Sequence, residues 1–217
     1  MFITGLQLLT ADLKATTEFY SSVLGLQVSE RTESSVSIQA GYSTITFLES
    51  VHSKPCYHFA FNIPPDKLDE AYKWSSARFQ IFDIESYGKI AGFPAWNARS
   101  FYFSDPAGNV LELIARSDLD EARKEGFDGN FILGVSEIGI PVTGVKEAFE
   151  NVCLEYNLRC FERQRVLDNF AAAGDDHGLL IFVEEGKLWY PTQIPAIAYP
   201  CRIEINDEHG MRTIAFG

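Results

Sequence analysis

Residues 100–114, Ser-Phe-Tyr-Phe-Ser-Asp-Pro-Ala-Gly-Asn-Val-Leu-Glu-Leu-Ile, predict two strands joined by a tight turn. Within the turn, Pro106 fixes its own φ and Gly108 can adopt a positive φ. The flanking runs are aromatic and aliphatic, as hairpin strands are. Because side chains alternate across a strand, Glu112 points away from the face that its two neighbouring leucines share. If the leucines pack on helices, Glu112 lines a polar interior and is a candidate metal ligand or base.

The composition narrows the class of protein. The chain has 217 residues, of which 46% are hydrophobic, so it is long enough for a sizeable core. It contains no apolar run near the ~18 residues of a membrane-spanning helix and no signal-peptide pattern. Its formal charge of −12 disfavours nucleic acid and anionic lipid as partners. Four widely spaced cysteines without a CxxC motif indicate reduced thiols, and we expect a cytoplasmic protein.

One order of elements is predicted three times: a strand, a helix and then three strands. The predicted helices cover residues 15–23, 65–77 and 145–156. The predicted strands cover residues 3–9, 26–31, 35–40, 43–48, 57–63, 79–84, 100–104, 109–115, 131–140, 159–165, 169–174 and 178–184. A terminal hairpin over 201–216 looks like the second half of a fourth unit. Residues 118–130 are predicted to link 1–117 to 131–217.

These segments resemble the vicinal oxygen chelate superfamily, which includes glyoxalase I, bleomycin-resistance proteins, fosfomycin-resistance thiol transferases and extradiol ring-cleaving dioxygenases. The motifs that carry the resemblance are Ala11–Leu13, Glu18–Tyr20, Val23–Leu26, Tyr57–Phe61 and Phe101–Leu113. The resemblance implies an α+β fold of repeated βαβββ modules, whose curled mixed sheets form a cup with the helices outside. It implies a small-molecule ligand inside the cup, and homodimers are common in the family.

The resemblance makes residues 1–117 a glyoxalase-like domain of two modules. Residues 131–217 would be a degenerate half that either closes the first cup or builds a dimer interface. Alternation along the strands gives each residue a face. Those expected on the packed face are Phe59, Phe61, Ile63, Phe101, Phe103, Leu111 and Leu113. Those expected inside the cup are His58, Ala60, Asn62, Ser100, Tyr102, Val110, Glu112 and Ile114.

Members of the family usually hold a divalent metal with side chains from these strands. The resemblance places His58 and Glu112 at two of the ligand positions. The first-strand position of the first module is Gly5, and the alternative position in that module is Thr46. An imidazole and a carboxylate suit Fe, Mn, Zn, Ni or Co. Two ligands fall short of the three that catalytic sites usually use, so Gln7, Tyr102, water or substrate would have to complete the set.

The second half offers fewer candidate ligands. Glu137 stands at the first-strand ligand position of the third unit, but Phe182 stands where the equivalent of Glu112 would be. We therefore expect no second metal site. His177 and His209 fall in predicted turns, and we expect both to be exposed.

Two interpretations of function stay open. In the first, the protein is a metal-dependent lyase, isomerase or dioxygenase, with His58 and Glu112 as catalytic residues and ligands. In the second, it is a binding protein of the bleomycin-resistance type, which needs no metal. A metal-free pair could also use His58 as a base oriented by Glu112, whose charge would raise the pKa of the histidine. The substrate-binding candidates are Gln7, Thr46, Asn62, Trp96, Arg99, Ser100 and Tyr102.

Overall fold

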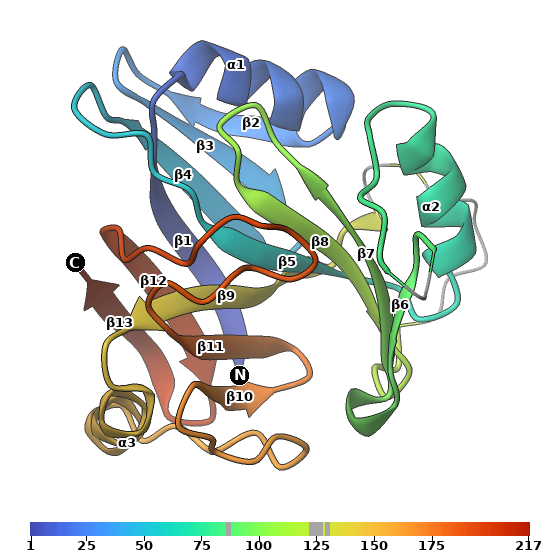
Figure 1. Ribbon diagram of the computed structural model, residues 1–217. Helices are drawn as coiled ribbons and strands as arrows, with labels where there is room; N and C mark the ends of the chain where they lie inside the picture. Colours follow the sequence, from blue (N-terminus) through green and yellow to red (C-terminus); the bar gives the residue numbers. More distant parts are fainter. Residues whose placement is uncertain (86–87, 122–127, 129–130) are drawn as a thin grey trace.

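The computed structural model of the chain describes residues 1–85, 88–121, 128 and 131–217. Its strands form one mixed, open sheet, and the few helices lie at the periphery of that sheet (Figure 1). This is the α+β arrangement that the sequence predicted. The predicted linker 118–130 falls largely outside the described residues, and the division at that segment stays a prediction.

The elements follow the predicted modular order. The first module holds β1 (Phe2–Thr10), α1 (Leu13–Glu18), a π-helical turn η1 (Phe19–Val23), β2 (Gln27–Arg31), β3 (Ser35–Ala40) and β4 (Ser43–Glu49). The second holds β5 (His58–Ile63), α2 (Leu68–Ser76), β6 (Ala91–Phe93), a 3-10 turn η2 (Pro94–Trp96), β7 (Ala98–Ser104) and β8 (Val110–Arg116). The third holds β9 (Gly134–Val142), α3 (Val145–Glu155), β10 (Phe170–Asp175) and β11 (Gly178–Glu184). The terminal hairpin is β12 (Cys201–Asp207) and β13 (Gly210–Phe216).

Two predicted strands do not form. Residues 79–84 make only isolated bridges, through Ile81 and Ile84, and the strand that pairs with β7 is β6 instead. Residues 159–165 make one bridge, between Cys160 and Ala173. Hydrophobic alternation alone does not make a strand, because each strand also needs a neighbour with free backbone groups in register.

The hairpin of residues 100–114 forms as predicted, and Asp105 holds its turn together. Its carboxylate accepts hydrogen bonds from the backbone N–H of Asn109 (3.0 Å) and from the Asn109 side chain (2.7 Å). It also accepts a hydrogen bond from the Tyr20 hydroxyl at 2.9 Å, which ties the turn to η1. Gly108 has φ of 88°, which a side chain would oppose. The turn therefore sets the direction in which β8 leaves it, and so the position of Glu112 on that strand.

The modules do not pair as expected, because the two modules within residues 1–117 were predicted to form one cup together. β5 lies between β8, to which it is parallel, and β9, to which it is antiparallel. β1 likewise lies between β4 and β12, and its register pair with β9 is Ile3 with Val135. The second module therefore shares its cup with the third module, and the first module shares a separate concave face with the terminal hairpin. This pairing brings the C-terminal half against the second module, and the two roles predicted for that half, closing the cup or building a dimer interface, stay predictions.

The faces of the strands agree with the predicted alternation. The residues expected on the packed face all belong to the main hydrophobic core: Phe59, Phe61, Ile63, Phe101, Phe103, Leu111 and Leu113. Tyr102 and Val110 belong to a second cluster that includes Trp189 and Ile181, and Ala60 and Ile114 to a third. One face of the second module thus packs on helices, and the other faces the third module.

Candidate metal centre

His58, Glu112 and Glu137 form a cluster on three adjacent strands. One ligand atom from each lies within 4.8 Å of the other two, and all three residues are buried. The register explains the meeting, because Ala60 of β5 pairs with Glu112 on one side and with Glu137 on the other. His58 is two residues before Ala60 and so shares its face. The single methyl group of Ala60 leaves the space that the two longer side chains enter.

The imidazole of His58 is fixed by its own strand pair. Its Nδ1 lies 3.0 Å from the carbonyl oxygen of Val110, its register partner on β8. A carbonyl only accepts, so Nδ1 carries the proton and Nε2 keeps its lone pair. Nε2 lies 3.8 Å from Oε2 of Glu112. A ring with one nitrogen held by a carbonyl and the other free is the usual form of a metal-binding histidine.

Burial sets the protonation of His58, contrary to the expectation of a raised pKa. Desolvation lowers the pKa of His58 below 6.5, against the attraction of Glu137 and the hydrogen bond to Val110. The neutral ring is the favoured form, and it is the form that can bind a metal. The salt bridge expected from the sequence between a charged His58 and Glu112 is therefore disfavoured.

Glu112 and Glu137 differ in their partners. Burial and the negative charge of Glu137 raise the pKa of Glu112 from 4.5 to about 8, while Arg116 and the hydroxyls of Ser100 and Tyr102 act in the opposite direction. Glu137 instead accepts a hydrogen bond from Nη2 of Arg116. One carboxylate thus has a cation beside it, and the other lies in a site whose burial favours the protonated form.

Arg116 is fully buried at the end of β8. Its Nε donates to Ser136 Oγ at 3.2 Å, and its Nη1 lies 3.6 Å from Asp176 Oδ1. Its guanidinium carbon is 5.6 Å from the ring centre of Trp96, within cation–π range. These contacts hold the guanidinium against Glu137 and away from solvent.

The cluster lies in the wall of an aromatic cavity of about 310 Å³. Side chains from β5 to β8 line one part, and side chains from β9 to β11 and from the segment after β11 line the rest. The lining residues are His58, Phe93, Trp96, Tyr102, Glu112, Ile114, Glu137, Gln164, Phe170, Ile181, Val183, Lys187, Leu188, Trp189 and Tyr190. Such a cavity, largely apolar with a few polar groups at one place, is typical of small-molecule sites.

The segment between β11 and β12, residues 185–200, crosses this cavity, and we name it the strap. In Figure 1 it is the orange-red segment that leads from β11 to β12 and passes in front of the sheet. Its backbone is held by hydrogen bonds such as Trp189 N–H to Ile194 O at 2.8 Å. The Trp189 ring centre lies 5.2 Å from that of His58, and the Tyr190 ring centre lies 5.5 Å from that of Tyr102. The strap therefore covers His58 with an aromatic side chain.

The structure brings together only some of the residues predicted to bind substrate. Trp96 and Tyr102 line the cavity with His58 and Glu112, and Ser100 is buried beside Tyr102 on the same face of β7. Gln7 and Thr46 line a different concavity, formed by β1, β4 and β12. Those two residues are thus separated from the cluster by the pairing of the modules.

The remaining two candidates make other contacts. The Asn62 side chain is buried and donates to the carbonyl oxygens of Asp176 (3.0 Å) and His177 (3.3 Å), which fixes the turn between β10 and β11. Arg99 is exposed and lies 3.6 Å from Asp69. Neither residue is among those that line the cavity with His58. His209 is exposed, as expected of the second half, whereas His177 is half-buried because its ring lies 4.7 Å from that of Phe2.

Three residues of the site were not predicted from the sequence to lie there. Glu137 was placed at the first-strand ligand position of the third unit, where no second metal site was expected. The signal for Arg116 was weak, since a single arginine after a hydrophobic strand is usually a surface residue. Trp189 lies in a segment without periodicity, so nothing in the sequence indicated its contact with His58.

Comparison with known families agrees with this architecture. Residues 3–113, just over half of the chain, match the Glyoxalase family, described as the Glyoxalase/Bleomycin resistance protein/Dioxygenase superfamily. The chain belongs to this superfamily. No curated protein sequence matches the chain.

Solved structures that are similar to this superfamily member include the following three. One described as a "putative dioxygenase from Bacillus subtilis subsp. subtilis str. 168" has a TM-score of 0.60 at 14% identity, covering 99% of this chain and 84% of its own. A glyoxalase/bleomycin resistance protein/dioxygenase from Nocardioides is 25% identical over 58% of this chain and 90% of its own, with a TM-score of 0.44. A lactoylglutathione lyase from Agrobacterium tumefaciens is 22% identical over 51% of this chain and 90% of its own, with a TM-score of 0.42. The Bacillus likeness shows that the fold extends over nearly the whole chain.

No helix among the described residues combines the length and the apolar character that crossing a membrane requires. The cytoplasmic location and the homodimer expected from the sequence stay predictions.

Proposed function

We propose that this superfamily member is a divalent-metal-dependent enzyme, a lyase, isomerase or dioxygenase, acting on a small molecule with oxygen donors. The observation that carries the proposal is the convergence of His58, Glu112 and Glu137 from three adjacent strands within 4.8 Å. The sequence predicts two ligands, and the pairing of β5 with β9 brings Glu137 beside them as the proposed third. Three protein ligands are the usual number in a catalytic metal site.

The donor set fits a divalent cation that accepts nitrogen and oxygen. A neutral imidazole offers Nε2, because Nδ1 donates to Val110. Two carboxylates would offset the charge of the ion, and Fe, Mn, Zn, Ni and Co are the candidates. When bound, the metal would polarise a neighbouring oxygen of the ligand as a Lewis acid.

The residues around the cluster have separable roles in this proposal. His58, Glu112 and Glu137 would hold the ion, and Val110 keeps His58 in the required tautomer. Arg116 orients Glu137 through its Nη2 and offsets part of the negative charge. Tyr102 and Trp189 flank the His58 ring, with ring centres 6.3 and 5.2 Å away, and exclude water from it. The aromatic wall would bind the apolar body of the ligand.

Metal content after reloading tests this proposal. Untagged protein would be stripped with a chelator, desalted, exposed to each of the five metals under nitrogen, and analysed by mass spectrometry of the bound metal. We expect about one ion per chain, and Glu112→Gln and Glu137→Gln should each weaken binding by at least tenfold. Glu204→Gln is the matched control, because Glu204 lines the other concavity.

Two outcomes would count against the enzyme. One is wild-type protein that retains no metal, and the other is equal loss in all three variants. If Glu112→Gln weakens binding and Glu137→Gln does not, the site has two protein ligands, as the sequence alone indicated.

A second function is favoured by the Arg116–Glu137 ion pair. This pair satisfies one carboxylate without a metal, and the raised pKa of Glu112 lets the other keep a proton. In this metal-free state the cup would bind an aromatic molecule without catalysing a reaction, as a binding protein does. Metal-free wild type that binds aromatic ligands tightly would support this alternative.

A further inference from the structure

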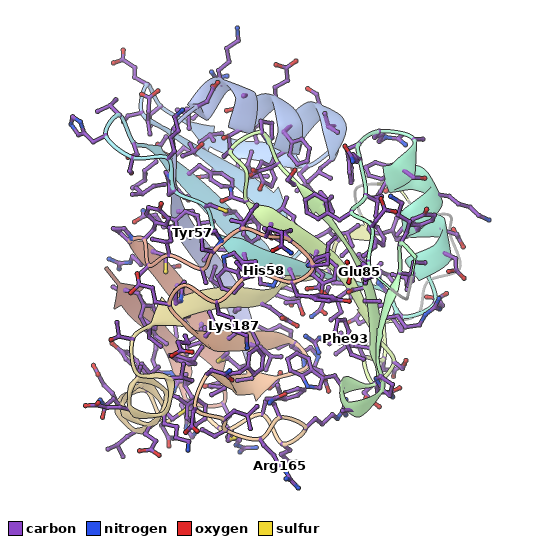
Figure 2. All side chains as sticks on the ribbon, in the orientation of Figure 1. Tyr57, His58, Glu85, Phe93, Arg165 and Lys187 are labelled. Atoms are coloured by element: carbon purple, nitrogen blue, oxygen red, sulfur yellow. The ribbon has the colours of Figure 1, made fainter. Side chains whose placement is uncertain are left out.

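We propose that Lys187 makes the cavity selective for ligands that carry an acidic group at its open end. The two ends of the cavity differ in the solvent exposure of the residues that line them. His58, Glu112 and Glu137 are buried, whereas Lys187, Leu188 and Tyr190 are exposed. The candidate metal centre therefore lies at the buried end of the cavity, and the strap forms its mouth. Figure 2 labels both residues, Lys187 on the strap and His58 on β5.

Charge is divided between these ends. The charged or ionisable groups at the buried end are His58, Glu112 and Glu137, and Lys187 is the one cation among the lining residues that the structure describes. Apart from Gln164, the other lining side chains are aromatic or aliphatic. Glu137 is already paired with Arg116 and Glu112 offers an acid no positive charge, so among the lining residues Lys187 is the place where a ligand acid can be accommodated.

The lysine ammonium has no anionic partner. Its Nζ lies 5.2 Å from the ring centre of Phe170, and no carboxylate of the described residues lies within ion-pair distance of it. Its backbone is nevertheless fixed, because its N–H donates to Glu184 O (3.1 Å) and its carbonyl accepts from Ala196 N–H (2.7 Å). The fixed backbone keeps Lys187 at the mouth of the cavity, where its ammonium can meet an acidic group of a ligand.

Trp189 lies two residues further along the strap and lines the same cavity. Trp189 is 5% exposed, and its indole Nε1 has no hydrogen-bond acceptor among the residues that the structure describes. This nitrogen is itself shielded, so Trp189 contributes the apolar part of its ring to the cavity wall. The strap thus offers the lysine ammonium to an anionic oxygen and the indole ring to the apolar body of the ligand.

The ligand class follows from shape and charge together. The aromatic walls fit one ring, and the volume of about 310 Å³ leaves room for a short side chain. We infer an aromatic ring with a short acidic side chain, the acid lying at Lys187. Only the chemistry at the buried end of the cavity rests on the proposed function. The preference for an acidic ligand does not depend on it.

The test compares an acid with its uncharged analogue in metal-free protein. Isothermal titration calorimetry would measure Kd for 3-phenylpropionate and for 3-phenylpropionamide, which differ in charge and hardly in shape. The ratio of the amide Kd to the acid Kd should fall roughly three- to fivefold in Lys187→Gln, the range of a partly exposed ion pair. Lys187→Arg should keep the wild-type ratio. Lys14→Gln, on the exposed surface of α1, is the matched control.

A ratio that does not change in Lys187→Gln would overturn the proposal, as would a wild type that binds neither compound. An equal fall of the ratio in Lys14→Gln would show that the effect comes from the net charge of the protein, and this would also overturn the proposal. Since the titration uses metal-free protein, a positive result stands even if the metal analysis fails. A negative result leaves the metal proposal standing.

Discussion

Glu137 of β9 is the register partner of Ala60 of β5, and this pairing carries a carboxylate from the third module into the cup of the second. On the opposite side, Ala60 pairs with Glu112 of β8. The two acidic side chains thus come from strands on either side of β5 and reach over one methyl group. The composition of the candidate metal centre depends on this small residue as well as on the ligands themselves.

Enlarging Ala60 should block the cluster. In Ala60→Leu the new side chain would occupy the space between Glu112 and Glu137, and we expect metal affinity to fall by at least tenfold. Ala60→Gly keeps the space and should bind metal like the wild type. Metal titrations of both variants, with circular dichroism to confirm folding, would measure this. Equal affinity in Ala60→Leu and the wild type would show that the two carboxylates do not meet across β5.

Glu112 should make the metal-free protein less stable as pH rises. The pKa of Glu112 is raised by burial to about 8 in the folded state, so its contribution is fully present below about pH 4.5 and is lost as pH rises through 8. Glu112→Gln cannot ionise and should be the more stable protein at pH 9, by roughly a few kcal/mol, with little difference at pH 5. Urea denaturation of both proteins at the two pH values would check this. A variant less stable than wild type at pH 9 would mean that ionised Glu112 is well paired.

Removing Arg116 should be costly because it leaves Glu137 without its buried cation. We expect Arg116→Met to lower the free energy of unfolding by about 3 kcal/mol or more. In Arg116→Met/Glu137→Gln the uncompensated charge is gone, so much of that loss should be recovered. Urea denaturation would give both values, with Lys146→Met as a control that removes an exposed ion pair to Asp168. Equal losses in the single and double variants would contradict a charge-based role for Arg116.

Gly139 should be intolerant of a side chain because Trp189 lies against it. A Cβ at Gly139 would lie 2.4 Å from Cη2 of Trp189, so the indole must move away. We expect Gly139→Ala to destabilise the fold by about 1–3 kcal/mol and to shift tryptophan fluorescence. Gly92→Ala is the matched control, because nothing lies within 4 Å of its Cβ position. Unchanged fluorescence in Gly139→Ala would mean that the strap does not rest on β9 as described.

The local chemistry of the strands was predictable from short stretches of sequence. The turn around Gly108 and the alternation along residues 57–63 and 100–114 placed His58 and Glu112 on the same face, and this is confirmed. Both signals depend on neighbours a few positions apart in the chain. The predicted strands over 79–84 and 159–165 had the same kind of pattern but no partner in register, and there the prediction was wrong.

The sequence by itself determined the modules, the family and the side of each strand that faces the cup, because backbone geometry makes side chains alternate wherever a strand forms. Only the tertiary structure decided which modules face each other. That choice depends on how the edges of whole sheets pair and on how much apolar surface each pairing buries, and these are sums over distant residues. For the same reason the sequence did not place Glu137 and Trp189 beside His58, since the first lies there because β9 pairs with β5 and the second because the strap crosses the cavity.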